Sequence, residues 1–351
     1  MKSVLFVVLI ALIFACNKKN DEVPTPTPEP YDFSAVEKVL DDSVPAKYGG
    51  NCYAVIHVDG KTVFSKGYGE YNGSTKMYIA SCTKWLSGAL IMSLVDEGKL
   101  SLSDTIGKFL PIFTANGKGH VPIRYLFSHC SGFPGDSDDG YESNPLITME
   151  SAVDQIAMNV PLRIAPGTVF NYGSVSMQIG GRIAEIVSGK SFFDLIQEKI
   201  FTPCGMTNTD FAQATNPLVA GGARSTPDDF ILFLDMIMRK GVTANGTRVL
   251  SEQSVIEMEK DQTNNARLDQ VPYPDGYVHA GIYGIGNWRD MTDNADNLIE
   301  NSSPGVFGSH PWVNRSKKLT GFIFTFILSG TGTSTLPTSI KVRGLARDAV
   351  N

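Results

Sequence analysis

The segment Tyr78-Ile79-Ala80-Ser81-Cys82-Thr83-Lys84-Trp85-Leu86 is the stretch around which the rest of the chain can be arranged. Apolar residues continue as far as Val95 and cover most of a helical circumference, which predicts a buried helix that ends at Gly98. Ser81 and Lys84 are three residues apart, so both side chains lie on one helical face, with about 5–6 Å between their Cβ atoms.

A serine hydroxyl beside a lysine amine in an apolar wall is what an activated serine nucleophile needs. Burial disfavours the ammonium form, so such a lysine can act as a base. One S-x-x-K is nevertheless expected by chance in about 350 residues, and an N-cap serine followed by a solvated lysine is the alternative. Two observations favour the chemical interpretation: Lys84 interrupts an apolar helix, and this is the only S-x-x-K of the chain.

The composition limits the class of protein. The chain has 351 residues, 42% of them hydrophobic, which is enough for one large domain or two closely packed ones. Its formal net charge is −6 and it has no basic stripe, which argues against a nucleic-acid partner.

The first residues predict an exported, lipid-anchored protein. Lys2 precedes the apolar run from Val4 to Phe14, which has the form of a signal peptide and is too short to span a bilayer stably. The run ends in Ala15-Cys16, which resembles a bacterial lipobox, where a cysteine becomes the lipidated N-terminus. A buried helix of a soluble protein is the alternative. We expect a signal peptide over 1–15, a Pro/Thr-rich tether over 16–32, and anchoring through Cys16 in the bacterial cell envelope, with the leaflet left open.

The order of predicted elements indicates an α+β fold. A helix is expected from Phe33 to Lys47, and a hairpin is expected around Asp59-Gly60. Further strands are expected over 282–288, 306–308 and 319–328, followed by a helix from about residue 340, while 100–239 is mainly helical. An antiparallel sheet is therefore built from both chain ends and flanked by helices. The serine hydrolase domain, 33–345, divides into an α/β lobe (33–99 and 245–345) and a mainly helical lobe (100–244), with a ligand cleft between them.

Five motifs follow one another in a familiar order. They are Ser81 to Lys84, His129-Cys130-Ser131-Gly132, Pro166-Gly167 leading to Tyr172-Gly173-Ser174, the run from Gly221 to Asp229, and Tyr283-Gly284-Ile285-Gly286. In this order the chain resembles the penicillin-recognising serine hydrolases: class C β-lactamases, serine D-Ala-D-Ala carboxypeptidases and related esterases. The resemblance covers about residues 33 to 345 and implies a β-lactamase/transpeptidase-like fold.

The resemblance implies a role for each motif residue. Ser81 is the nucleophile, Lys84 is its proton partner, and Tyr172 matches the tyrosine of the family's Y-x-N or Y-x-S element. A tyrosine near a lysine is drawn toward the phenolate, so the pair can take the serine proton and return it to the leaving group. A buried aromatic with a satisfied hydroxyl is the alternative for Tyr172. Ser174 can offer a hydrogen bond to Lys84 or to a substrate amide.

The third motif of the family departs from the usual pattern here. It commonly reads K-T-G, H-x-G or W-G-G, and the best match is Ser303-Pro304-Gly305, followed by Val306. Val306 and Ser81 would then supply the two backbone N–H groups of an oxyanion hole. The cation that commonly binds a substrate carboxylate is missing at Ser303, with Arg224 and Arg315 as candidate replacements. This weakens the β-lactamase interpretation and favours an esterase or amidase.

The cysteines and histidines offer further candidates. Cys82 and Cys130 both border the expected cleft, and we hypothesise a disulfide between them, with free thiols as the alternative; Cys52 and Cys204 are expected to be free. The chain has no C-x-x-C pair and no G-x-S-x-G elbow, so neither a zinc or redox motif nor a Ser-His-Asp triad is favoured. His129 is then structural, and His310 is strand-end packing or part of the cleft wall.

The sequence thus predicts a lipid-anchored serine hydrolase that cleaves an ester or amide through an acyl-Ser81 intermediate. An esterase ranks first, a D-amino-acid peptidase second and a true β-lactamase third. The alternative is a penicillin-binding module that acylates slowly, or a non-catalytic envelope sensor. Neither a metal nor an organic cofactor is implied, and the oligomeric state is left open.

Overall fold

A computed structural model describes residues 31–212, 215–273, 281–328 and 335–350. The expected signal peptide, Cys16 and most of the expected tether lie outside the described residues. Among the helices that the structure describes, none is long and apolar enough to cross a bilayer.

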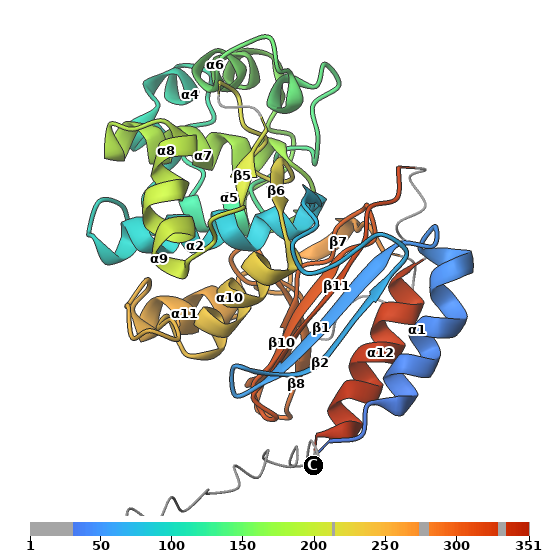
Figure 1. The fold of residues 1–351 in the computed structure, drawn as a ribbon. Coiled ribbons are helices and arrows are strands. Elements are labelled where there is room, and N and C mark those ends of the chain that lie inside the picture. The colour runs from blue at the N-terminus through green and yellow to red at the C-terminus, as the bar shows by residue number, and fades with distance from the viewer. Residues whose placement is uncertain (1–30, 213–214, 274–280, 329–334, 351) are drawn as a thin grey trace, which may run out of the picture. The chain divides into compact units, whose positions relative to one another are not determined.

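A six-stranded antiparallel sheet forms the centre of one part of the fold (Figure 1). Its strands, in spatial order, are β2 (Lys61–Tyr68), β1 (Cys52–Val58), β11 (Leu319–Phe324), β10 (His310–Asn314), β9 (Leu298–Ser302) and β8 (Trp288–Thr292). β1 pairs with β11 from Tyr53 opposite Phe324 to Val58 opposite Leu319, which joins the two ends of the chain in the middle of the sheet.

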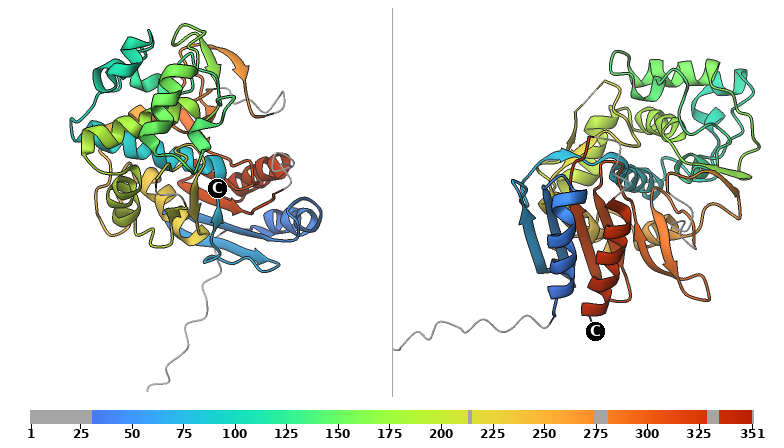
Figure 2. Two further views of the ribbon diagram at one scale, coloured as in Figure 1. Left: turned by 90° about the horizontal axis from the view of Figure 1, so that it is seen from above. Right: turned by 90° about the vertical axis from the view of Figure 1, so that its right-hand side faces the viewer.

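Helices cover both faces of this sheet. α1 (Ser34–Lys47) and α12 (Leu336–Ala349) lie side by side on one face (Figures 1 and 2), where Leu40, Trp312 and Val342 belong to one buried cluster. On the other face α10 (Pro227–Met238) packs against β11, β10 and β1. This burial of apolar side chains on both faces is the main source of stability for a sheet of this kind.

The helix that follows Ser81, α2 (Thr83–Asp96), belongs to a second and larger cluster of buried apolar side chains, together with the remaining helices. These other helices are α3 (Ile106–Phe109), α4 (Pro111–Ala115), α5 (Ile123–Phe127), α6 (Met149–Asn159), α7 (Val175–Ser188), α8 (Phe192–Ile196), α9 (Thr202–Cys204) and α11 (Glu252–Glu259), with the 3₁₀ turns η1 (Ala80–Cys82) and η2 (Tyr141–Ser143) and the π turn η3 (Gln197–Phe201).

Two small sheets of short strands pair segments of the helical part that are distant in sequence. β3 (Met77–Tyr78), β6 (Ala223–Ser225) and β5 (Asp210–Phe211) form one small antiparallel sheet, which fixes the approach to Ser81. β4 (Val169–Asn171) pairs in parallel with β7 (Arg267–Gln270), and this pair ends directly before Tyr172.

The predicted α+β class and the β-lactamase/transpeptidase-like fold are confirmed. The hairpin around Asp59-Gly60 forms as predicted, and Thr226 caps α10 by accepting a hydrogen bond from the Asp229 N–H. Two strand predictions were wrong: 306–308 is a turn, and the strand expected over 282–288 begins only at Trp288. α10 falls within the range expected for the helical lobe, yet it packs on the sheet.

Candidate active site

Ser81 lies on the 3₁₀ turn η1, one residue before the cap of α2. Ala80 precedes it with φ of +45°, a left-handed conformation that is unfavourable for a residue with a side chain. All residues of α2 from Thr83 to Leu94 are buried, so the helix is a rigid base for the serine. The prediction that Ser81 stands at the start of a buried helix is confirmed.

Lys84 reaches from the first turn of α2 to the serine. Its Nζ donates hydrogen bonds to Ser81 Oγ at 3.0 Å and to the Ala220 carbonyl at 2.9 Å. Burial lowers the pKa of the Lys84 amine to about 7, while the negative charge of Asp136 acts in the opposite direction. A large fraction of Lys84 is therefore neutral near pH 7 and can accept the Ser81 proton.

Tyr172 follows β4, where its N–H donates to the Gln270 carbonyl of β7 at 2.9 Å. Its ring stacks on Trp288, with 5.4 Å between centroids, and lies 4.6 Å from the His129 ring. The Lys84 Nζ stands 4.5 Å from the centroid of the Tyr172 ring. Aromatic packing on several sides therefore fixes the tyrosine next to the lysine.

The Tyr172 hydroxyl is buried, and no described residue completes a hydrogen bond to it. Burial raises the pKa of Tyr172 well above its usual value, and the nearby Ser81 hydroxyl lowers it by a smaller amount. The expectation that Lys84 draws this tyrosine toward the phenolate was wrong, because the desolvation penalty dominates. In the resting site Tyr172 is a neutral donor, and Lys84 is the group that can be a base.

Ser174 begins α7 and contacts a loop from the helical part. Its N–H is shared between the Gly135 carbonyl at 2.7 Å and Asp136 Oδ1 at 3.0 Å. Gly173 makes this approach possible, because a Cβ atom there would lie 2.1 Å from the Gly135 carbonyl oxygen. Of the two partners considered for Ser174, Lys84 is not one among the described hydrogen bonds, since its amine donates to Ser81 and Ala220. Ser174 lines the pocket, and a bond to a substrate amide stays a prediction.

Ser303 is fully buried and does not face the pocket. Its Oγ donates to the carbonyl of Ser81 at 2.9 Å and to that of Gly286 at 3.5 Å. Ser303 therefore fixes the loop that follows β9 to the turn that carries the nucleophile. It does not occupy the recognition position that the motif match implied for it, so it is a positioning residue.

The rest of this loop faces the pocket. A Cβ atom on Gly305 would lie 2.4 Å from the Ile79 carbonyl oxygen, so only glycine allows this close approach. Val306 follows in a turn and is 48% exposed. Within the described part of the chain, no group accepts a hydrogen bond from the N–H of Ser81 or of Val306, which leaves both for a ligand.

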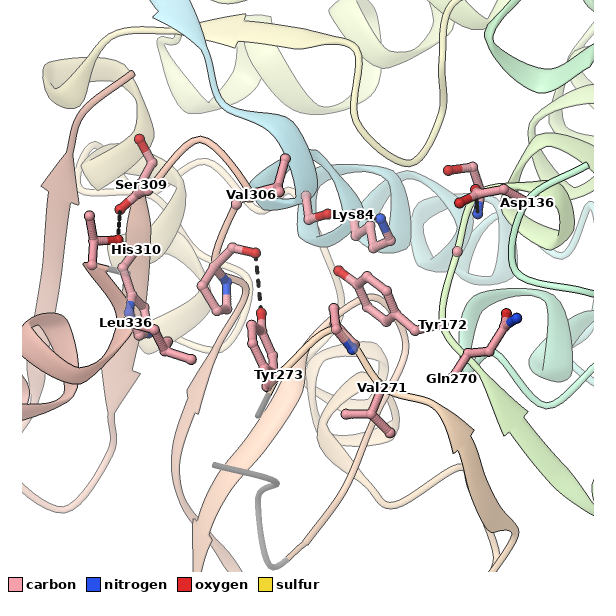
Figure 3. A pocket seen from close by; sticks show the side chains of 18 of the residues that line it. Lys84, Asp136, Tyr172, Gln270, Val271, Tyr273, Val306, Ser309, His310 and Leu336 are labelled. Carbon is pink, nitrogen blue, oxygen red and sulfur yellow. Dashed lines mark hydrogen bonds between the residues drawn. The ribbon is translucent and has the colours of Figure 1, made fainter. Parts of the chain in front are cut away.

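Ser81, Lys84, Tyr172 and Val306 all line one pocket of about 640 Å³ (Figure 3). Its walls come from α2, from the loop before α7, from the end of β7 and from the loop between β9 and β10. The site residues expected from the sequence, apart from Ser303 and the cysteines, are therefore brought together in one cavity of the size that binds small molecules.

The two arginines considered as replacements for the missing cation are used elsewhere. Arg224 pairs with Asp210 through two hydrogen bonds, and Arg315 pairs with Glu259 at 2.5 Å; neither lines the pocket. The idea that either arginine substitutes for the cation at Ser303 was therefore wrong.

The two histidines have structural positions. His129 is buried with φ of +59°, and burial lowers the pKa of its ring well below the usual value, so it is neutral and packs against Tyr172. His310 begins β10, lines the pocket and interacts with Arg343 Nη1 at 2.9 Å through Nε2.

The hypothesised disulfide does not form: Cys82 and Cys130 are free, as are Cys52 and Cys204. Cys82 Sγ points to the Ser309 carbonyl, 3.6 Å away, whereas Cys130 packs in a different cluster with Phe170 and Trp288. The two side chains face different surroundings. Burial raises the pKa of the Cys130 thiol to about 12, so this cysteine is an inert core residue.

Several residues that line the pocket were not predicted from the sequence, among them Asp136, Gln270 and Tyr273. Asp136 lies in a loop rich in Asp, Ser and Gly, a composition that by itself indicates only a solvated loop. Gln270 ends the polar strand β7, whose residues show no apolar alternation, and Tyr273 follows it. No spacing rule marks any of the three, because each is brought to the site by pairing with distant segments.

The motifs, the fold and this pocket define a class of protein. The sequence profile of the family described as Beta-lactamase matches residues 49–334, and the chain belongs to that family.

Individual relatives extend this assignment. A candidate beta-lactamase from Bacteroides dorei, known as a crystal structure, is 31% identical, with a TM-score of 0.79 over 90% of this chain and 99% of that one. Penicillin-binding protein 4 from Amycolatopsis lactamdurans is 31% identical over 51% of this chain and 55% of its own length. The D-amino acid amidase from Ochrobactrum anthropi has the same fold, at 18% identity and a TM-score of 0.69, over 90% of this chain and 99% of that one.

Another relative is protein flp of Staphylococcus aureus strain N315, which is 29% identical over 52% of this chain. That match spans 39% of the staphylococcal protein, and the match to penicillin-binding protein 4 spans about half of that relative.

Proposed function

We propose that this protein is a serine acyl hydrolase that cleaves an ester or amide through an acyl-Ser81 intermediate. The observation that carries the proposal is the contact of the buried Lys84 amine, whose pKa is about 7, with Ser81 Oγ at 3.0 Å. This is a nucleophile with a base of suitable pKa in hydrogen-bond reach.

In the acylation step, neutral Lys84 takes the proton from Ser81 Oγ while the oxygen attacks the substrate carbonyl carbon. Lys84 can keep one N–H on the Ala220 carbonyl, which leaves its lone pair for the serine proton. The new C–O bond converts the carbonyl oxygen to an oxyanion, which the N–H groups of Ser81 and Val306 stabilise.

Collapse of this intermediate breaks the bond to the leaving group, which needs a proton. The Tyr172 hydroxyl, which lacks a described partner, supplies it and is reprotonated by the Lys84 ammonium. A water molecule then attacks the acyl-enzyme by the same steps in reverse: it loses a proton to Lys84, and Ser81 Oγ leaves with a proton. The products are the acid and the regenerated enzyme.

The pocket lining supports one substrate class over another. The serine at position 303 is buried, and neither candidate arginine is near, which supports an esterase or amidase over an enzyme that recognises a β-lactam carboxylate. A D-amino-acid peptidase ranks second and a β-lactamase third. A slowly acylating penicillin-binding module is the second candidate function, which the relative named penicillin-binding protein 4 favours.

The experiment compares wild type with Ser81→Ala on p-nitrophenyl butyrate, nitrocefin and a D-Ala-D-Ala peptide. Hydrolysis of the ester that disappears in Ser81→Ala supports the proposal. Stable labelling of Ser81 by fluorescent penicillin without turnover of any substrate would instead support the binding module.

We also propose that the mature protein is anchored to the bacterial cell envelope through lipidated Cys16. This rests on the apolar run and the Ala15-Cys16 sequence alone. Labelling of expressing cells with an alkyne fatty acid tests it: label is expected in the wild type and not in Cys16→Ser, and equal labelling of both would contradict the anchor.

A further inference from the structure

Acidic residues stand out in the described lining of the pocket around Ser81. Asp136 and Asp269 line it, and Lys84 is the only lysine or arginine among its described lining residues. The internal segments outside the described residues, 213–214, 274–280 and 329–334, contain neither lysine nor arginine in their sequence. Since the Lys84 pKa is about 7, the pocket is negative at mildly alkaline pH.

The arginines that contact the pocket-lining residues His310 and Asp269 are paired with carboxylates. Arg343 contacts His310 Nε2 through Nη1, but its guanidinium also pairs with Asp290 and Glu300. Arg347 pairs with Glu300 as well. These two arginines and two carboxylates together carry no net charge. On the other side, Arg267 pairs with Asp269 at 3.4 Å, which reduces the effect of that acid.

Asp136 is the acid that remains, and it is held in place. Its Oδ1 accepts the Ser174 N–H at 3.0 Å, at the start of α7, while its Oδ2 has no partner among the described residues. The side chain is exposed to the pocket (Figure 3), and its charge is near enough to the Lys84 amine to raise the pKa of that group. A fixed carboxylate beside the nucleophile attracts a cation and repels an anion.

We propose that Asp136 is a specificity residue that selects substrates with an ammonium or other cationic group close to the scissile ester or amide carbonyl. This inference rests on the proposed serine hydrolase function. It predicts the opposite charge preference from that of an enzyme that binds a substrate carboxylate. An ion pair in a solvated pocket is expected to change kcat/KM about three- to tenfold.

The test uses pairs of substrates that differ only in a permanent charge. For a cation on the acyl side, the pair is the p-nitrophenyl esters of 4-(trimethylammonio)butanoate and of its uncharged carbon isostere 5,5-dimethylhexanoate. For a cation on the leaving group, the pair is butyrylthiocholine and 3,3-dimethylbutyl thiobutyrate. The measured quantity is the ratio of kcat/KM within each pair, at pH 8.5 and low ionic strength.

The wild type is expected to prefer the cationic member of at least one pair three- to tenfold. The pair that shows this preference tells whether the cation binds on the acyl side or on the leaving-group side. Asp136→Asn keeps an acceptor for the Ser174 N–H and should bring the ratio of kcat/KM for the cationic and the uncharged substrate close to one. In the wild type, 0.5 M salt should have the same effect, because it screens the charge of Asp136. Asp138→Asn removes the same charge from an exposed residue of the same loop that does not line this pocket, so it should keep the wild-type ratio.

A second measurement does not depend on a substrate charge. Without the negative charge of Asp136, the pKa of Lys84 should fall, so the acid limb of labelling by an uncharged fluorophosphonate should move to lower pH in Asp136→Asn. Ratios near one in both pairs, or a preference that survives Asp136→Asn, would overturn the inference and leave the hydrolase intact. Absence of any Ser81-dependent hydrolysis would instead overturn the proposed function.

Discussion

At the scale of single residues, the account depends on the protonation of Lys84. Its amine must be neutral to accept a proton, and burial brings its pKa to about 7. We expect kcat/KM for an uncharged ester to rise with pH and level off above an apparent pKa near 7. Lys84→Met should lower kcat/KM by about 10²–10⁴-fold. A flat profile between pH 5.5 and 9 would contradict the role of Lys84.

The same residue should lower the stability of the folded state. The pKa of Lys84 is lower in the folded than in the unfolded chain, so the unfolded chain binds more protons between pH 7 and the ordinary lysine range. The destabilisation is therefore complete below pH 7 and declines as pH rises above it. Lys84→Met should have a higher Tm than wild type at pH 6.5, and this advantage should shrink at pH 9.5. A Tm difference between Lys84→Met and wild type that grows with pH would contradict a lowered pKa of the buried Lys84 amine.

Tyr172 allows a separate test, because its hydroxyl is a donor without a described partner. Tyr172→Phe keeps the stacking on Trp288 and removes only the proton donor. The loss of kcat/KM, which reports acylation, should be about 10²-fold or more for an anilide, which has a poor leaving group, and small for a p-nitrophenyl ester, whose leaving group needs no proton. Equal losses on both substrates would show that the hydroxyl has another role.

At the scale of elements, the loop from Ser303 to Gly308 positions the second N–H of the expected oxyanion hole. Gly305→Ala would place a Cβ atom 2.4 Å from the Ile79 carbonyl, so the loop must shift and Val306 must move with it. We expect kcat to fall by about 10²–10³-fold, the effect of losing one oxyanion donor. Gly344→Ala is the matched control, because it lies within α12 and meets nothing closer than 3.6 Å.

The elements also show what could be predicted from the sequence. The helix expected from Phe33 to Lys47, observed as α1, and the β1–β2 hairpin around Asp59-Gly60 were predicted close to their observed positions, because local spacing and turn residues determine them. The S-x-x-K spacing placed Ser81 and Lys84 correctly for the same reason. Ser303 was misjudged because its burial depends on contacts with Ser81 and Gly286, which are distant in sequence. Asp136 was missed because only the fold brings its loop beside α7.

At the scale of the whole molecule, a buried ion cluster ties the last helix to the pocket wall. Arg343 of α12 is 3% exposed and pairs with Asp290 and Glu300, behind His310. Arg343→Ala removes the buried cation that pairs with both carboxylates and leaves Glu300 with Arg347, so it should reduce the free energy of unfolding by about 3–5 kcal/mol. Lys66→Ala, which removes a partly exposed pair with Glu37 and Asp41, should change it by at most about 1 kcal/mol. If urea unfolding gave similar losses of unfolding free energy for Arg343→Ala and Lys66→Ala, the stabilising role of the buried ion cluster would be contradicted.

The activation of Ser81 by Lys84 can be measured directly through the reactivity of the serine. Intact-protein mass spectrometry should follow the rate at which an uncharged fluorophosphonate adds to the purified protein between pH 5.5 and 9. One adduct is expected, located on Ser81 by peptide mapping, with a rate that rises to a plateau with an apparent pKa near 7. The adduct should be absent in Ser81→Ala, and its formation should be slowed by about 10²-fold or more in Lys84→Met. No adduct on Ser81, or a rate that Lys84→Met leaves unchanged, would contradict the account.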